Sequence, residues 1–157
     1  SELTTTLYAM ETVVEAAATN EIAGFPVGTT RLLLIAYGEV RAGIDLSQIT
    51  EDDVTVLSDT IQIRIPPPRI IDAKIDVNRT RVYDYDQGFL NLGPDVGPQL
   101  ADMAQEEALS KVSIAACENG ILDQANQRAA LVLQGLFGGV AEGRIVEIVT
   151  QGPTTCP

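Results

Sequence analysis

The order of two hydrophobic periodicities constrains this chain more than any other feature of its sequence. Up to residue 86, apolar and polar residues alternate in several segments, which is the pattern of β-strands with one buried face. From residue 98 to residue 138, apolar residues recur every three or four positions, as in amphipathic helices. A last alternating segment follows at 144–150. This order predicts an α+β fold, with two consecutive helices packed on one face of a mostly antiparallel sheet and a C-terminal strand.

The chain is predicted to form one domain over residues 1–157. Its 157 residues are enough for a single hydrophobic core, and no internal repeat or low-complexity segment divides it. Within that domain we expect a strand-rich half at 1–86, a helical half at 98–138 and the final strand at 144–150.

The clearest local signal is that of a β-hairpin. Residues 54–56 alternate, a tight turn fits at Ser58 and Asp59, and residues 61–65 alternate again with isoleucine at every second position. Isoleucine on one face and polar side chains on the other predict one buried and one solvated face. The three prolines at 66–68 then end the pairing, because proline has no amide hydrogen to donate.

The N-terminal strand signal is less regular. Residues 3–19 predict an extended strand, although the alanines at 16–18 also fit a helix. Residues 20–30 contain glycines and Pro26, so we expect a loop there.

A long central strand is predicted at 31–46, because residues 32–35 are apolar on both faces. Gly38 and Gly43 interrupt this strand. They indicate a bulge or the close approach of another segment.

The composition excludes several kinds of site. The chain has no histidine and two cysteines, so Ser-His-Asp and Cys-His catalysis, histidine-ligated zinc or haem, and four-cysteine clusters cannot form. A formal net charge of -12 opposes binding to nucleic acid, which requires lysine and arginine to neutralise phosphates. Paired carboxylates could still perform acid–base chemistry, yet 22 acidic residues give close pairs by chance. We therefore expect no enzymatic activity.

One acidic segment is a candidate cation site. Asp84, Asp86 and Asp95 occupy positions 1, 3 and 12 of a calcium-binding loop. Phe89 stands where such a loop needs its sharp-turn glycine, and an aspartate replaces the bidentate glutamate. The alternative to calcium is a strand end that runs into a solvated acidic loop. The acidic run at 51–53 leaves a similar choice between a cation site and a solvated turn, and no other cofactor is expected.

The two cysteines are the main indication of a cellular compartment. Cys117 lies in a helical pattern and Cys156 in the C-terminal tail. A disulfide between them would close a loop of about 40 residues, to which loop entropy assigns about 4 kcal/mol. The alternative is a buried free Cys117 and an incidental Cys156. If the disulfide forms, the protein functions in a periplasm, at a cell surface or outside the cell.

Contact with a membrane is expected only through a segment outside this chain. No apolar run is long enough to cross a bilayer. Because the chain starts at Ser1 rather than Met, a signal peptide or membrane anchor could precede it in a precursor.

Several segments spread over the chain together form a family pattern. They are Tyr37-Gly38-Glu39-Val40, Ala42-Gly43-Ile44-Asp45-Leu46, Ile61-Gln62-Ile63-Arg64-Ile65-Pro66 with Pro68 and Ile70, Ile75-Asp76, Val82-Tyr83-Asp84, and Gly120-Ile121-Leu122 with Ala125. In these residues the chain resembles a bacterial family catalogued as domain of unknown function 4230. The resemblance implies an uncharacterised, membrane-anchored envelope protein and no known chemistry.

The expected function is protein–protein contact, mainly self-association. The apolar stripe on the predicted helices serves either as core or as an oligomer interface, and the N-terminal strand could pair with another copy. We expect a structural or interaction domain that forms homo-oligomers in the cell envelope or outside the cell. The alternative is a module that binds a cation or a small molecule through the acidic loop at 84–95.

Overall fold

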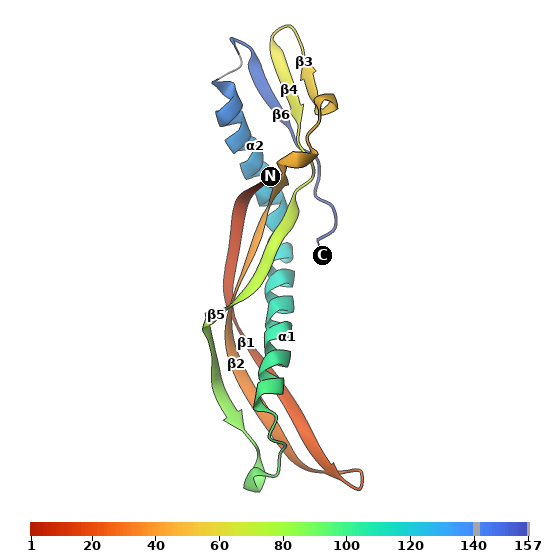
Figure 1. Ribbon diagram of the computed structural model, residues 1–157, viewed down its shortest axis with the longest axis vertical. Helices are drawn as coiled ribbons and strands as arrows, with labels where there is room; N and C mark the ends of the chain where they lie inside the picture. The colour runs from red at the N-terminus through yellow and green to blue at the C-terminus, as the bar shows by residue number, and fades with distance from the viewer. Residues whose placement is uncertain (140–141, 157) are drawn as a thin grey trace. The chain divides into compact units, whose positions relative to one another are not determined.

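The computed structural model describes residues 1–139 and 142–156 and has the α+β architecture that the sequence predicts. In these residues, six strands form two three-stranded sheets, ordered β1-β2-β5 and β3-β4-β6, and two α-helices follow one another along the chain (Figure 1). The elements in chain order are β1 (Glu2–Ile22), β2 (Phe25–Asp45), η1 (Leu46–Gln48), η2 (Glu51–Asp53), β3 (Val54–Val56), β4 (Thr60–Arg64), β5 (Arg69–Asp86), η3 (Phe89–Asn91), α1 (Gly97–Glu118), α2 (Ile121–Gly138) and β6 (Ile145–Val149).

The chain divides into two compact units. Unit 1 comprises Ser1–Tyr8, Val40–Asp72 and Ala116–Pro157, and unit 2 comprises Ala9–Glu39 and Ala73–Ala115. Each unit has a hydrophobic cluster of its own. Segments far apart in the sequence make up each unit, so no local sequence pattern marks this division.

A hairpin of two long strands opens the chain. β1 and β2 have 21 residues each, and they are joined at Ala23 and Gly24, whose φ angles of 52° and 81° are both positive. A two-residue turn of this kind matches the twist of antiparallel strands. The predicted loop at 20–30 is therefore wrong, because only two residues turn and Pro26 is tolerated near the start of a strand. The alanines at 16–18 lie in β1 rather than in a helix.

In unit 2, α1 packs on one face of the β1-β2-β5 sheet. Alternate residues of the strands point toward the helix, and the helix meets them with buried residues four positions apart. The cluster consists of Val14, Ala16, Leu32, Leu34, Ala36, Leu100, Ala104 and Ala108. This part of the predicted helical stripe is therefore core.

Gly38 and Gly43 of β2 are positions of close approach, as the sequence predicts. A Cβ at Gly38 would lie 2.7 Å from a methyl carbon of Val112 in α1. A Cβ at Gly43 would overlap the carbonyl oxygen of Leu3 in β1. Both positions therefore require a residue without a side chain.

In unit 1, the predicted hairpin forms as β3 and β4. The strands are antiparallel, with Val54 opposite Ile63 and Val56 opposite Ile61. The amide of Leu57 donates to the carbonyl of Thr60 at 2.8 Å, which closes the predicted turn. The register therefore places the apolar residues of both strands on one face.

β6 completes this second sheet by pairing with β4 in parallel. The apolar face packs against α2, where Ala129 and Leu133 are buried together with Ile44 and Ile65. On the opposite face, Gln62 Nε2 donates to a carboxylate oxygen of Glu147 at 3.0 Å. The isoleucine pattern predicted burial correctly at Ile63 and Ile65, which pack in this cluster, whereas Val54 and Val56 of β3 are exposed.

Candidate functional site

The long edge of the first sheet is the most prominent surface for contact with another chain. β1 lies at one end of the strand order β1-β2-β5, so one side of its backbone faces away from the sheet. Its residues 9–22 belong to unit 2. From residue 6 to residue 18 the burial pattern alternates without interruption, which is the geometry of a regular strand.

The composition of β1 offers few of the features that block a sheet edge. Natural sheets block their edges with lysine, proline, bulges or frequent charges. β1 has no lysine, arginine or proline, and only four of its 21 residues are charged, all of them glutamate. Val13 and Ala17 are exposed on the face opposite α1.

The other edge, β5, has several of these protective features. Eight of its 18 residues are charged. The amide of Tyr37 in β2 donates to the side-chain hydroxyl of Thr80 in β5 at 3.3 Å. That hydroxyl donates in turn to the carbonyl of Asp76 at 2.7 Å, four residues earlier in the same strand. The guanidinium of Arg79 stacks 3.6 Å above the Tyr37 ring. β1 is therefore the edge with fewer barriers to pairing.

Two of the three predicted calcium ligands accept hydrogen bonds from neighbouring groups. Asp86 accepts the amide hydrogen of Gly88 at 2.8 Å, and Asp95 accepts the hydroxyl hydrogen of Tyr85 at 3.3 Å. Asp84 and Asp86 are two residues apart in β5, whereas Asp95 lies beyond η3. Among the residues that the structure describes, no group of three or more acidic or cysteine side chains could hold a metal ion. The structure thus does not assemble Asp84, Asp86 and Asp95 as one ligand set.

An arginine lies beside two of these aspartates. Glu15, Arg31, Asp84 and Asp86 line a hollow of about 250 Å³ on the sheet face opposite α1. Arg31 Nε lies 3.8 Å from a carboxylate oxygen of Glu15. A protein cation therefore already offsets part of the negative charge that a bound metal ion would need.

The hydroxyl of Tyr85 is the perturbed titratable group of this region. Desolvation of the ring, followed by the negative charge of Asp95 and the hydrogen bond to it, raises the pKa of Tyr85 above its usual value. A tyrosine with a raised pKa is a weaker acid, so nothing here activates it as a general base at neutral pH.

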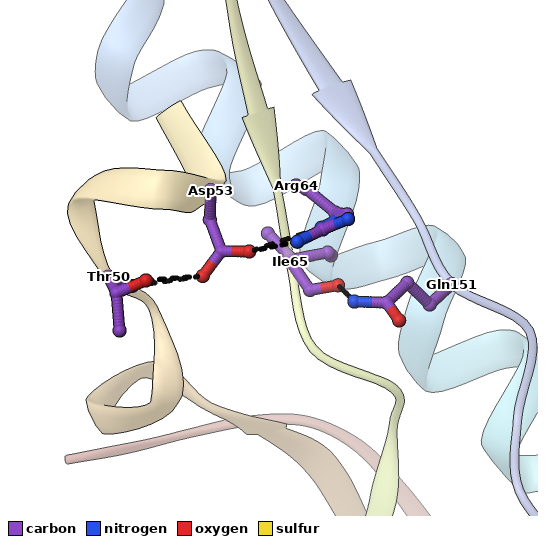
Figure 2. A network of polar contacts seen from close by, with 5 residues as sticks. All are labelled: Thr50, Asp53, Arg64, Ile65 and Gln151. Carbon is purple, nitrogen blue, oxygen red and sulfur yellow. Dashed lines mark hydrogen bonds and ion pairs between the residues drawn. The ribbon is translucent and has the colours of Figure 1, made fainter. Parts of the chain in front are cut away.

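Within the acidic run at 51–53, Asp53 belongs to a structural network (Figure 2). Asp53 accepts the amide hydrogen of Thr50 at 3.0 Å, and its other oxygen accepts from Arg64 Nη2 at 2.9 Å and Nε at 3.1 Å. The hydrogen bond from the Thr50 amide, followed by that from Arg64, holds the pKa of Asp53 below its ordinary value. The guanidinium of Arg64 therefore occupies the position beside Asp53 that a bound cation would take.

A similar carboxylate fixes the end of β2. Asp45 accepts hydrogen bonds from the hydroxyl of Ser47 at 2.6 Å and from its amide at 3.1 Å. These bonds lower the pKa of Asp45, with a smaller contribution from Arg69, which also pairs with Glu2. Asp45 thus caps the start of η1, where the Ser47 amide would otherwise lack an acceptor within the helix.

The predicted disulfide is present. Cys117 of α1 and Cys156 of the tail are bonded, with their Cα atoms 5.9 Å apart. The tail is held a second time, because Gln151 Nε2 donates to the carbonyl of Ile65 at 3.0 Å (Figure 2). The backbone carbonyl of Gln151 also accepts a hydrogen bond from Asn126 Nδ2 at 2.8 Å. All of these groups lie in unit 1, so the C-terminal segment is an integral part of it.

Sequence reasoning missed one exposed apolar group in unit 2. Ile22, Phe25, Phe89 and Leu90 project from two turns. The signal available in the sequence was the absence of charged residues from the two segments at 22–30 and 87–94.

These observations define a small α+β domain whose most accessible feature is a strand edge. Its sequence matches the family model described as "Protein of unknown function (DUF4230)" over residues 1–146, and the chain therefore belongs to this family. The resemblance seen in the sequence is confirmed. Comparisons with curated proteins and with solved structures find no similar protein in either set. Neither helix in the described part of the chain is long and apolar enough to span a bilayer.

Proposed function

We propose that this protein is a non-enzymatic structural domain that self-associates through the edge of β1. The observation that carries the proposal is the contrast between the two edges of one sheet. β5 carries eight charged residues among 18, whereas β1 offers a regular strand with four charges in 21 residues. A long edge strand of this kind is a template for pairing with another strand.

A second copy of β1 is the partner we propose. Antiparallel pairing of two β1 strands across a two-fold axis would extend the backbone ladder and would join two three-stranded sheets into one. The alternation at residues 9–18 supports this arrangement, because a regular strand keeps its hydrogen-bonding groups in one plane.

Electrostatic repulsion opposes this association. Each copy carries a formal net charge of -12, and the charged residues of β1 are all glutamates. Repulsion between exposed charges is screened by salt over about 8 Å at physiological ionic strength. The association should therefore strengthen as the salt concentration rises.

We also propose an oxidising compartment, such as the cell envelope or the extracellular space. The Cys117–Cys156 disulfide supports this location, because structural disulfides persist there and are rare in a reducing cytosol.

Light scattering coupled to size-exclusion chromatography tests the proposed function. The mean molar mass should rise from the monomer value of 16.7 kDa as protein and salt concentrations increase. A constant monomer mass under all of these conditions would refute self-association.

A further inference from the structure

Two neighbouring segments of unit 2 contain no charged residue. Residues 22–30 and 87–94 contain no charged side chain, although 20% of the chain is charged. The loop at 87–94 lies against the strand ends next to the β1–β2 turn, because a Cβ at Gly28 of β2 would overlap the backbone of Leu92 and Asn20 Nδ2 of β1 donates to the carbonyl of Leu92 at 3.1 Å. Figure 1 shows the β1–β2 turn and η3 at the same end of unit 2.

Large apolar side chains project from these segments. We use the name apolar tip for Ile22, Phe25, Phe89 and Leu90, whose exposed fractions are 67%, 73%, 81% and 75%. Single exposed apolar residues are common on proteins, but a charge-free group of four on neighbouring turns indicates a binding surface.

The backbone beneath the tip satisfies its own hydrogen bonds. The amide of Asn91 donates to the carbonyl of Gly88 at 3.1 Å, and the amide of Gly93 donates to that of Gln87 at 2.8 Å. The hydroxyl of Thr30 donates to the carbonyl of Pro94 at 2.6 Å. Internal partners of this kind lower the cost of moving a loop into partly apolar surroundings, because backbone groups lose hydrogen bonds to water there.

The backbone of the loop at 87–94 is strained at two residues. Leu90 and Asn91 have φ angles of 53° and 54°, in the left-handed region that a leucine rarely occupies. Strain of this kind persists where the surrounding structure imposes it and is frequent at binding sites.

The charges around the tip select among lipid surfaces. Glu21, Asp86 and Asp95 flank the two turns, against one arginine, Arg31. This excess of negative charge opposes an anionic membrane and leaves an electrically neutral one as the complementary surface.

We propose that the apolar tip inserts into the interface of an electrically neutral lipid bilayer. The tip projects from two turns and offers apolar side chains without lysine or arginine, so burial of hydrocarbon supplies the attraction. Its phenylalanines suit this depth, because phenylalanine is among the side chains that interfacial segments bury at the boundary of headgroups and acyl chains. This inference goes beyond self-association through β1 and does not depend on it.

A tryptophan reporter tests the proposal directly. The chain has no tryptophan, so Phe89→Trp introduces a single indole at the tip. With phosphatidylcholine vesicles, its fluorescence should shift to shorter wavelength and be quenched by brominated acyl chains. In a flotation assay, the double variant Phe25→Gln, Leu90→Gln should have a vesicle partition coefficient at least about tenfold lower than that of the wild type.

Matched controls separate the tip from general hydrophobicity. Leu131→Gln removes an equally exposed leucine, 70% accessible on α2, and should leave vesicle binding unchanged. Val13→Lys, which is designed to block the β1 edge, should also leave it unchanged. Melting curves identify any variant that fails to fold.

Three results would overturn the inference. One is the absence of a fluorescence shift with both neutral and anionic vesicles. Another is a shift with anionic vesicles alone, which would contradict the charge argument. The third is a shift without lipid as the protein concentration rises, which would assign the tip to protein contact.

Discussion

Cys117 and Cys156 are bonded to each other across 39 positions of sequence, which joins the end of α1 to the C-terminal tail. The bond restricts the unfolded chain more than the folded one, because the tail is also held by Gln151.

Removing this disulfide should destabilise the protein strongly. We expect the double variant Cys117→Ser, Cys156→Ser to lose about 3–4 kcal/mol of unfolding free energy, as loop-closure entropy predicts. Urea unfolding of the variant and the wild type measures the difference, and the wild type with a reductant is the matched control. An unchanged midpoint in both comparisons would show that the bond does not constrain the unfolded chain.

Asp53 should make the free energy of unfolding depend on pH. Its folded pKa is lower than the ordinary value of 3.8, so the unfolded state takes up the proton first as the pH falls. The contribution of Asp53 is therefore present above pH 3.8 and is lost as the pH falls below it. Asp53→Asn should be less stable than the wild type at neutral pH. The difference in unfolding free energy between the two proteins should become smaller as the pH falls. Asp52→Asn, in the same turn, is the control, and a gap that stays constant with pH would contradict this assignment.

Two glycines should respond to alanine in opposite directions. Gly135 lies in α2, where an added Cβ would meet only open space, so Gly135→Ala should add about 0.5–1 kcal/mol through helix propensity. Gly43→Ala should cost about 1–3 kcal/mol, because its Cβ would overlap the Leu3 carbonyl oxygen. Thermal unfolding of both variants checks this, and equal effects would argue against the close pairing of β1 and β2 at Gly43.

Replacing Leu90 should weaken lipid contact without loss of stability. Asparagine tolerates the left-handed region better than leucine, so Leu90→Asn should keep or raise the melting temperature. The same variant should bind phosphatidylcholine vesicles more weakly, because it removes an apolar side chain from the tip. A lower melting temperature with unchanged vesicle binding would contradict both expectations.

The sequence predicted local structure where side-chain chemistry alone determines it. Isoleucine at every second position set the faces of β4, and the prolines after Ile65 ended its pairing. The loop predicted at 20–30 failed because glycine and proline are also compatible with a tight turn between long strands.

Pairings between distant segments could not be predicted. β6 joins β4 in parallel although about 80 residues separate them, and no local pattern specifies such a partner. The position of β1 at a sheet edge depends on the same global arrangement. The spacing of Asp84, Asp86 and Asp95 suggested a calcium loop. In the structure Asp84 and Asp86 belong to strand β5, whereas Asp95 accepts a hydrogen bond from Tyr85, so the three carboxylates do not form one ligand set.

The most direct test of the central claim compares two valines on opposite edges of one sheet. Val13 of β1 and Val82 of β5 are 53% and 49% exposed, so Val13→Lys and Val82→Lys change charge and exposed apolar area equally. Sedimentation velocity over a range of protein and salt concentrations measures the association of each. We predict that Val13→Lys stays monomeric, whereas Val82→Lys associates like the wild type. Equal association of both variants, or a wild type that remains monomeric throughout, would contradict self-association through β1.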